Sequence, residues 1–194
     1  MSEKPTQTAP KRALVLLAPG AEEMEVVIVT DVLRRGGIEV VLAGLDGMGP
    51  FLCSRGVSLV ADEGLTEALV EDEIFDLVVL PGGLGGAEAL AESELVGRLL
   101  HGQHRSGRLV AAICAAPLAL VRHGVFAGEP MTSHVSVRDQ VSRHGVWTAA
   151  RVVETDGLIT SMGPGTAFEF SLALVANLCG TAVAESLRTP MVLD

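Results

Sequence analysis

The chain has 194 residues, of which 48% are hydrophobic, and its formal net charge is −10 at pH 7. This length suits one sizeable hydrophobic core. The acidic balance argues against general nucleic-acid binding, and the apolar runs are shorter than the roughly 20 residues that cross a bilayer.

The three cysteines, Cys53, Cys114 and Cys179, cannot all pair within one chain, and their spacing is not that of a metal site. We therefore expect a reducing, cytoplasmic location. Residues 1–10 are polar and lack the apolar segment of an export signal. We expect them to form a disordered extension before one domain over residues 11–194.

Strands and helices are predicted to alternate along the chain. Buried strands are expected at 13–18, 39–45, 76–80 and 109–113, and helices at 21–35, 65–73, 94–105, 115–122 and 166–178. Hairpins are expected within 51–61 and 151–161, a weak strand at 131–133, a further helix at 137–143 and a packed apolar tail at 189–194. This alternation predicts an α/β fold with a doubly wound, mostly parallel sheet.

Cys114 is predicted to stand where a buried strand turns directly into a helix. Pro117 fits the first turn of that helix, where no backbone donor is needed. A strand-to-helix turn without a loop is the layout of a nucleophile elbow. Because a helix N-terminus favours negative charge, we expect a stabilised thiolate at Cys114. A buried structural cysteine is the alternative.

Distinctive residues follow four of the predicted strands, namely Glu25, the pair Gly82-Gly83, Cys114 and His134. Ligands of such sheets bind beyond the carboxyl ends of the strands, so these residues predict one site. Taken alone, Glu25 could instead complement the helix dipole, and His134 could be a hydrogen-bonded group at a strand end.

Three other interpretations are disfavoured. His101 and His104 share a predicted helix without a further ligand nearby, so no metal site is expected. The glycine run 82–86 lacks the Lys-Ser/Thr pair of a phosphate-binding loop. With no tyrosine and a single tryptophan, Trp147, the chain has few rings for a flavodoxin-type flavin, and no cofactor is expected.

Six segments, in order along the chain, resemble the ThiJ/PfpI superfamily, and within it the branch of Parkinson disease protein seven (the DJ-one branch). They are Lys11-Arg-Ala-Leu-Val15, Gly20-Ala-Glu-Glu-Met-Glu25, Cys53-Ser-Arg55, Val79-Leu-Pro-Gly-Gly83, Ala111-Ala-Ile-Cys-Ala115 and Gly163-Pro-Gly-Thr-Ala-Phe-Glu-Phe170. The resemblance covers nearly the whole chain. It implies a flavodoxin-like three-layer sandwich, a homodimer and an oxidation-sensitive cysteine.

The resemblance also implies roles for individual residues. Cys114 matches the family's reactive cysteine, Glu25 the glutamate that hydrogen-bonds its sulfur, and His134 a second catalytic residue. The N–H groups of Gly83 and Ala115 match the oxyanion-binding donors.

Cys53 matches a cysteine near the dimer interface and is a second candidate for oxidation. Two positions depart from the family pattern. Val60 stands where a further cysteine is often found, and Met162 stands where some relatives have an arginine.

The expected function is that of a cysteine-dependent, cofactor-independent glyoxalase III or protein deglycase with a role in the oxidative-stress response. Its substrates would be methylglyoxal, glyoxal or their protein and nucleotide adducts. A thiolate adds to an aldehyde, paired N–H donors stabilise the oxyanion, and one acid/base, Glu25, moves a proton between adjacent carbons. The alternative is a non-enzymatic redox sensor or chaperone switched by oxidation of Cys114 to sulfinate.

Overall fold

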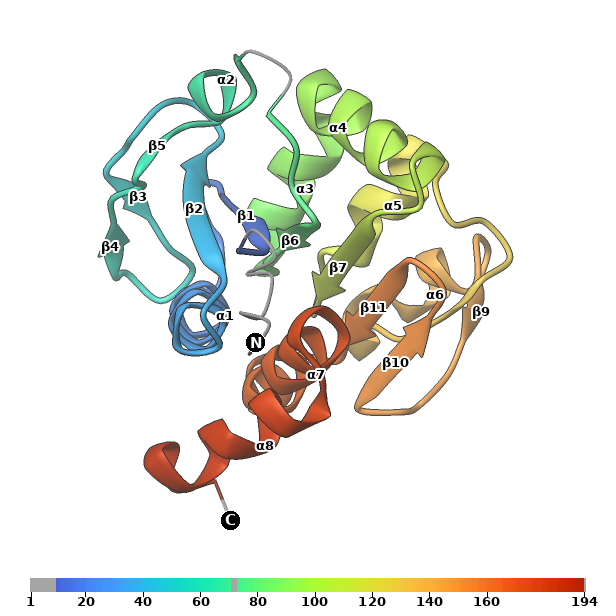
Figure 1. The fold of residues 1–194 in the computed structure, drawn as a ribbon. Coiled ribbons are helices and arrows are strands. Elements are labelled where there is room, and N and C mark those ends of the chain that lie inside the picture. The colour runs from blue at the N-terminus through green and yellow to red at the C-terminus, as the bar shows by residue number, and fades with distance from the viewer. Residues whose placement is uncertain (1–9, 71–72, 194) are drawn as a thin grey trace, which may run out of the picture.

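A computed structural model describes residues 10–70 and 73–193, and its centre is a seven-stranded sheet (Figure 1). The strands are β1 (Arg12–Leu17), β2 (Glu39–Gly44), β5 (Glu63–Gly64), β6 (Leu77–Leu80), β7 (Leu109–Ile113), β10 (Val152–Thr155) and β11 (Leu158–Ser161). Their order is β10-β11-β7-β6-β1-β2-β5, and only β10 and β11 pair antiparallel. The predicted doubly wound, mostly parallel sheet is confirmed.

Helices cover both faces of the sheet and give three layers. The helices are α1 (Glu23–Arg35), α2 (Leu65–Ala68), α3 (Leu84–Glu92), α4 (Glu94–Arg105), α5 (Pro117–His123), α6 (Arg138–Val141), α7 (Ala167–Cys179) and α8 (Thr181–Arg188). One core cluster joins the sheet to α1, α7 and α8, and the other joins it to α2 through α6. Figure 1 shows α1 and α7 below the sheet and α3, α4 and α5 above it.

Strand β1 shows why these sequences form a sheet that is covered on both faces. Leu14 and Leu16 belong to one core cluster, whereas Ala13 and Val15 belong to the other. Successive side chains of a strand point to opposite faces, so a strand between two helical layers must be apolar at every position. The same alternation holds along β7, where all five residues are buried.

Two short sheets lie outside the main one. Strands β3 (Phe51–Leu52) and β4 (Ser58–Leu59) form the predicted first hairpin, with shorter strands than expected. Strands β8 (Pro130–Met131) and β9 (Val146–Trp147) pair parallel with each other. The predicted strand before His134 is therefore not part of the central sheet. The N–H of Thr132 donates to the side-chain hydroxyl of Thr160 in β11 at 2.9 Å, so a side-chain hydrogen bond takes the place of backbone pairing with the central sheet there.

The sequence prediction missed helices α3 and α8 and strands β5 and β9. Helix α3 was not predicted because Gly85 and Gly86 suggested a loop. A Cβ on Gly86 would lie 2.7 Å from the Cα of Ala21, so glycine serves close packing there rather than a turn. The helix expected over 65–73 is shorter, since α2 ends at Ala68. Of that range, residues 71 and 72 lie outside the described part, as do residues 1–9 of the predicted extension.

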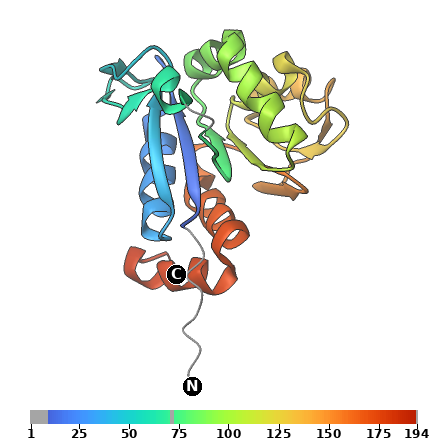
Figure 2. The ribbon, with the colours of Figure 1, turned by 45° about the horizontal axis from the view of Figure 1, so that its top comes forward.

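The chain end packs as predicted at two positions only. Met191 and Leu193 lie partly buried against the core cluster that includes α7, but Val192 is 85% exposed. In Figure 2, α8 crosses the end of the molecule where β1 begins. No helix within residues 10–70 and 73–193 has the length and hydropathy that a membrane span requires.

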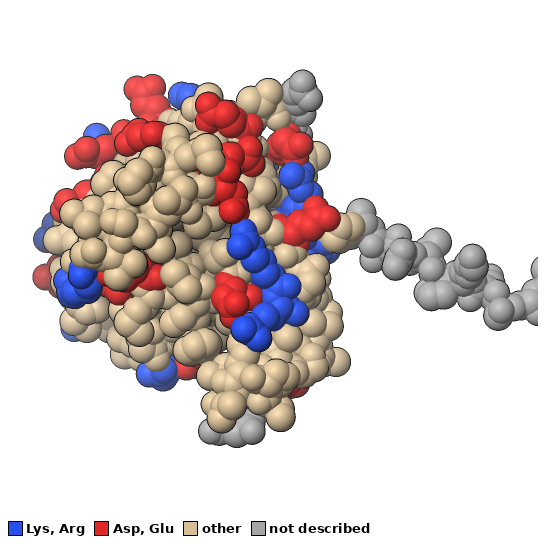
Figure 3. Space-filling view, turned by 90° about the vertical axis from the view of Figure 1, so that its left-hand side faces the viewer, with Lys and Arg blue, Asp and Glu red and all other residues tan. Residues whose placement is uncertain are grey.

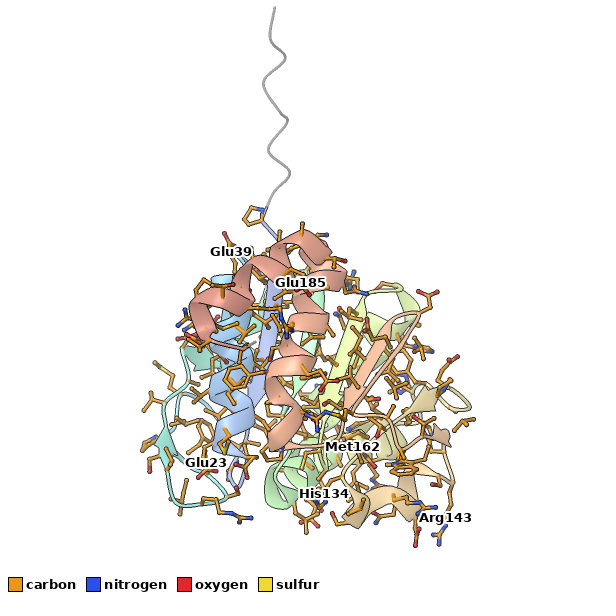
Figure 4. All side chains as sticks on the ribbon, turned by 90° about the horizontal axis from the view of Figure 1, so that it is seen from below. Glu23, Glu39, His134, Arg143, Met162 and Glu185 are labelled. Carbon is orange, nitrogen blue, oxygen red and sulfur yellow. The ribbon has the colours of Figure 1, made fainter. Side chains whose placement is uncertain are left out.

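The two ends of the sheet differ in what they carry. Figure 4 places Glu23 and His134 at one end of the molecule and Glu39 and Glu185 at the opposite end. Glu39 is the first residue of β2, whereas Glu23 is the first residue of α1, which follows the carboxyl end of β1. The carboxyl ends of the parallel strands therefore point to the end of the molecule that carries Glu23 and His134. This is the end at which the sequence predicts the site.

Candidate functional site

Cys114 occupies a sharp turn between β7 and α5. Its φ angle is 64°, a left-handed conformation that costs energy for any residue with a Cβ. The turn is fixed on both sides, since the N–H of Cys114 donates to the Ser161 carbonyl at 2.9 Å and its carbonyl accepts from the N–H of His134 at 2.8 Å. Pro117 is the first residue of α5, as predicted. The strand-to-helix elbow is therefore present.

Glu25 lies fully buried in the first turn of α1. Its Oε2 accepts a hydrogen bond from the N–H of Gly82 at 2.7 Å. Its Oε1 is also buried and makes no hydrogen bond of good geometry within the described residues. The carboxyl faces the Cys114 thiol closely enough that each group alters the pKa of the other through hydrogen bonding. The predicted proximity of Glu25 and Cys114 is therefore observed.

Two glycines after β6 make this proximity possible. A Cβ on Gly82 would lie 2.5 Å from the Cβ of Cys114 and 2.8 Å from Oε2 of Glu25. Gly83 has a φ of 79° and would bring a Cβ to 2.3 Å from the Gly20 carbonyl oxygen. Only glycine fits at either position without displacing its neighbours.

The N–H groups of Gly83 and Ala115 both reach the sulfur of Cys114, and each lowers the pKa of the thiol. Ala115 precedes α5 and Gly83 precedes α3, so two helix N-termini converge on this atom. Two such donors beside one nucleophile form a binding site for an oxyanion that develops next to the sulfur.

Burial nevertheless raises the pKa of the Cys114 thiol to about 12, and the charge of Glu25 is the second cause. The expectation of a stabilised thiolate at Cys114 is therefore wrong, because burial and the charge of Glu25 outweigh the two N–H donors, which lower the pKa. Burial likewise raises the pKa of Glu25 from 4.5 to about 7, against the opposing effects of the Gly82 and Cys114 hydrogen bonds. Near neutral pH the pair therefore holds at most one negative charge.

His134 lies at the same opening, although it follows β8 and not the central sheet. Its side chain is exposed, and its Nδ1 lies 2.8 Å from the Ser136 hydroxyl. A Cβ on Gly163 would lie 3.8 Å from Cδ2 of His134 and 3.9 Å from Sγ of Cys114. The imidazole and the sulfur therefore flank the same glycine.

A cavity of about 450 Å³ opens above Cys114. Its lining residues come from loops at the carboxyl ends of several strands. They are Gly20, Glu22, Ser54, Arg55, Gly83, Leu84, Gly85, Cys114, Ala115, His134, Ser136 and Pro164. Sequence reasoning assigned no role to Glu22, Ser54, Arg55 or Ser136, although the first three lie in segments that carry the family resemblance.

Several hydrogen bonds join the loop of the β3–β4 hairpin to the start of α1. The Ser54 hydroxyl lies 2.7 Å from Oε2 of Glu22 and 3.0 Å from Oε2 of Glu23, so it can donate to either. Glu23 also accepts from the N–H of Arg55 at 2.9 Å. These bonds hold Ser54 and Arg55 at the cavity wall.

The other two cysteines lie away from this cavity. Cys53 is buried beside Phe51, and burial raises its pKa with smaller contributions from the charges of Glu23 and Glu22. Cys179 ends α7 and is partly buried, which also raises its pKa. Among the described residues no three His, Cys, Asp or Glu side chains cluster as a metal site would require.

The two positions that depart from the family pattern are not among the residues that line the cavity. Met162 lies in the loop after β11, where its N–H donates to the Arg151 carbonyl at 3.2 Å. Figure 4 shows Met162 on the same side of the molecule as His134. Val60 is exposed beyond the β3–β4 hairpin.

Comparisons with known proteins agree with this geometry. The chain is 52% identical over 171 residues to protein dj-1beta of Drosophila melanogaster, covering 88% of this chain and 90% of the relative. The crystal structure of that fly protein matches with a TM-score of 0.92 at 46% identity, covering 95% of this chain and 99% of that one.

Two further relatives carry informative names. The glutathione-independent glyoxalase DJR-1.2 of Caenorhabditis elegans is 43% identical over 187 residues, covering 95% of this chain and 98% of the relative. The structure of oxidised Toxoplasma gondii DJ-1 matches with a TM-score of 0.88 at 33% identity, covering 94% and 98% of the two chains. The model of the DJ-1/PfpI family matches residues 11–177. With its elbow cysteine, buried glutamate and this match over most of its length, the chain belongs to the DJ-1/PfpI family.

Proposed function

We propose that the chain is a cysteine-dependent, cofactor-independent glyoxalase of the glyoxalase III type, which also removes 2-oxoaldehyde adducts as a deglycase. The observation that carries the proposal is the environment of one atom, Sγ of Cys114. It faces the buried carboxyl of Glu25 and the N–H groups of Gly83 and Ala115, at the base of the cavity. The glyoxalase name of the worm relative supports the same reaction class.

The reaction begins when the sulfur of Cys114 adds to the aldehyde carbon of methylglyoxal. Its proton passes to the Glu25 carboxylate, and the N–H groups of Gly83 and Ala115 stabilise the oxyanion of the hemithioacetal. Each well-placed donor of this kind contributes about 3 kcal/mol to a transition state.

Glu25 first gives this proton to the oxyanion, which makes Glu25 a carboxylate again. It next transfers a proton from the former aldehyde carbon to the neighbouring carbon through an enediol. This step oxidises the first carbon to a thioester and reduces the second to an alcohol, so no external electron acceptor is required. Water then hydrolyses the thioester to lactate and returns the proton to the thiol. One carboxyl with a pKa of about 7 suits both directions of proton transfer at neutral pH.

His134 is assigned to the hydrolytic step. Its imidazole is exposed at the cavity and flanks Gly163 together with the sulfur, so it can activate the incoming water. When the substrate is an adduct of an amine, arginine or nucleotide, His134 would activate water in the same way, and the hydrolysis would separate the acid from the repaired group. Replacing His134 should therefore slow product release more than hemithioacetal formation.

The direct test is turnover of methylglyoxal to lactate without glutathione. The wild type is expected to be active, and Cys114→Ala should lose at least about 10³-fold in kcat/KM, as for other covalent nucleophiles. Cys53→Ala and Cys179→Ala are the matched controls and should retain activity, since neither lines the cavity. A Cys114→Ala protein as active as the wild type would end the proposal.

A second candidate function uses the same cysteine as a redox sensor, or as a chaperone switched by oxidation. Cys114 is accessible from the cavity, and its sulfinate would find donors in Gly83, Ala115 and protonated Glu25. The solved structure of the Toxoplasma gondii relative is that of an oxidised form. Absence of turnover together with selective oxidation of Cys114 would favour this candidate.

We also propose that the protein is a homodimer through the side that carries α1 and the β3–β4 hairpin. Exposed apolar side chains gather there, namely Met24, Val27, Met48, Leu52, Val57 and Val60. Figure 3 shows that uncharged side chains cover much of this side. A contiguous apolar area of this kind is typical of a surface that is buried in an assembly.

A further inference from the structure

We propose that Glu22 is a specificity-determining residue of the Cys114 site, whose fixed negative charge holds a proton on Glu25 and selects uncharged carbonyl substrates over carboxylate-bearing ones. This deepens the proposed function and rests on it only in taking Cys114 as the reacting group. The charged or titratable groups that share the cavity with Glu22 are Arg55, Cys114 and His134.

Glu22 is well placed for this role. It lines the cavity but is only 7% exposed, so its carboxylate acts from within the wall. The Ser54 hydroxyl lies 2.7 Å from its Oε2 and fixes its direction. Its N–H donates to the Gly82 carbonyl at 2.9 Å, and the N–H of Gly82 in turn donates to Glu25. Glu22 is thus tied to the same loop that holds the reactive pair.

The charge of Glu22 acts both on the Glu25–Cys114 pair and on a ligand that enters the cavity. Burial is the main cause of the raised pKa of Glu25, and the negative charge of Glu22 adds a smaller contribution in the same direction. The cation at the cavity, Arg55, is exposed and donates to the Ser54 carbonyl, so solvent screens its charge more strongly. The charge of Glu22 in the cavity wall therefore repels an anionic ligand that enters the cavity.

The matched control is Glu23. It has the same exposure of 7%, lies next in sequence and also accepts from Ser54, but it does not line the cavity. Glu22→Gln and Glu23→Gln each remove one charge and keep an amide oxygen for Ser54. Because Glu23 accepts more hydrogen bonds from the hairpin loop than Glu22 does, a purely structural role would affect Glu23→Gln at least as strongly as Glu22→Gln.

The test compares neutral iodoacetamide with anionic iodoacetate, followed at the Cys114 peptide by mass spectrometry. In both reactions the sulfur displaces iodide, so the rate ratio cancels the thiolate fraction and reports only the field on the reagent. Glu22→Gln should raise the iodoacetate-to-iodoacetamide ratio at least about fivefold, as expected for one partly buried charge at an effective dielectric constant of about 20. Glu23→Gln should leave the ratio unchanged.

A second readout is the pH dependence of iodoacetamide labelling. Without the charge of Glu22, the apparent pKa of the Glu25–Cys114 pair should fall, so the labelling profile of Glu22→Gln shifts to lower pH and that of Glu23→Gln does not. An unchanged reagent ratio in Glu22→Gln, or equal shifts in the two variants, overturns the proposal. These measurements need no turnover, so they stand apart from any failure of the glyoxalase assay.

Discussion

At the scale of the residue, the pair Glu25 and Cys114 decides the chemistry of the site. Burial raises the pKa of both groups, to about 7 and about 12, so the native protein favours a shared proton over two charges. A thiol beside a carboxylate and a thiolate beside a carboxylic acid contain the same number of protons. The reactive form is therefore one proton transfer away from the resting form.

Glu25 should make the folding stability depend on pH. Because its pKa is raised from 4.5 to about 7 on folding, its contribution is fully present below pH 4.5 and is lost as the pH rises through about 7. Glu25→Gln removes this loss and still accepts from Gly82. Relative to this variant, the wild type should lose roughly 3 kcal/mol of unfolding free energy between about pH 5 and the alkaline side of the transition.

Urea denaturation at several pH values measures this difference. The control is Glu154→Gln, since Glu154 is exposed on β10 and should give the pH dependence of the wild type. If wild type and Glu25→Gln respond to pH in parallel, Glu25 does not carry a raised pKa.

The same pair predicts the oxidation products of Cys114. A sulfinate needs donors, and protonated Glu25 with the N–H of Ala115 would supply them, while a third oxygen would crowd the pocket. Glu25→Gln keeps a donor and should still form sulfinate, whereas the shorter Glu25→Asp should shift the products toward sulfenate or sulfonate. Intact-mass measurement after graded peroxide treatment tests this. Identical product ladders in Glu25→Asp and the wild type would contradict the pairing.

At the scale of the element, the first turn of α1 anchors the hairpin loop that closes the cavity. Glu23 accepts from the N–H of Arg55 and from Ser54, and its hydrogen bonds to backbone and side chain hold its pKa below the usual value despite the opposing effect of burial. The anchoring is thus strongest while Glu23 is ionised. It weakens as the pH falls toward the pKa of this carboxyl, because a protonated carboxyl is a poorer acceptor.

Glu23→Ala should release the hairpin loop over residues 53–57. The N–H of Arg55 loses its acceptor, at a cost of about 1–2 kcal/mol locally. Hydrogen exchange of these amides should accelerate about tenfold or more, while the amides of β7, buried on both faces, should exchange as in the wild type. Unchanged protection of the Arg55 amide would show that the loop is held in another way.

At the scale of the whole molecule, the side with α1 and the β3–β4 hairpin is the surface that we propose for the homodimer. Val27 and Leu52 are 50% and 63% exposed there. Leaving such side chains in water forgoes about 1 kcal/mol or more for each one that a partner could cover. We therefore expect the protein to form the proposed homodimer at micromolar concentration.

Light scattering of charge-introducing variants measures this. Leu52→Asp should shift the dimer toward monomer by at least about tenfold in the dissociation constant, because it places a carboxylate in an apolar contact. Val146→Asp is the control, since Val146 is 57% exposed on β9, at the opposite side in Figure 1. A wild-type protein that is monomeric at micromolar concentration, or equal weakening by both changes, would contradict this interface.

The sequence by itself determined the mostly parallel sheet, all of its strands except the edge strand β5, and the elbow. Runs such as 77–80 and 109–113 are apolar throughout, and only the three turn residues 114–116 separate β7 from Pro117, so local pattern was sufficient. Only the tertiary structure decided the chemistry of the site. Whether Cys114 ionises depends on burial by distant segments, which reversed the expectation from its own helix. Glu22 and Arg55 reach the cavity because two loops meet there, and no periodicity along the chain reports such a meeting.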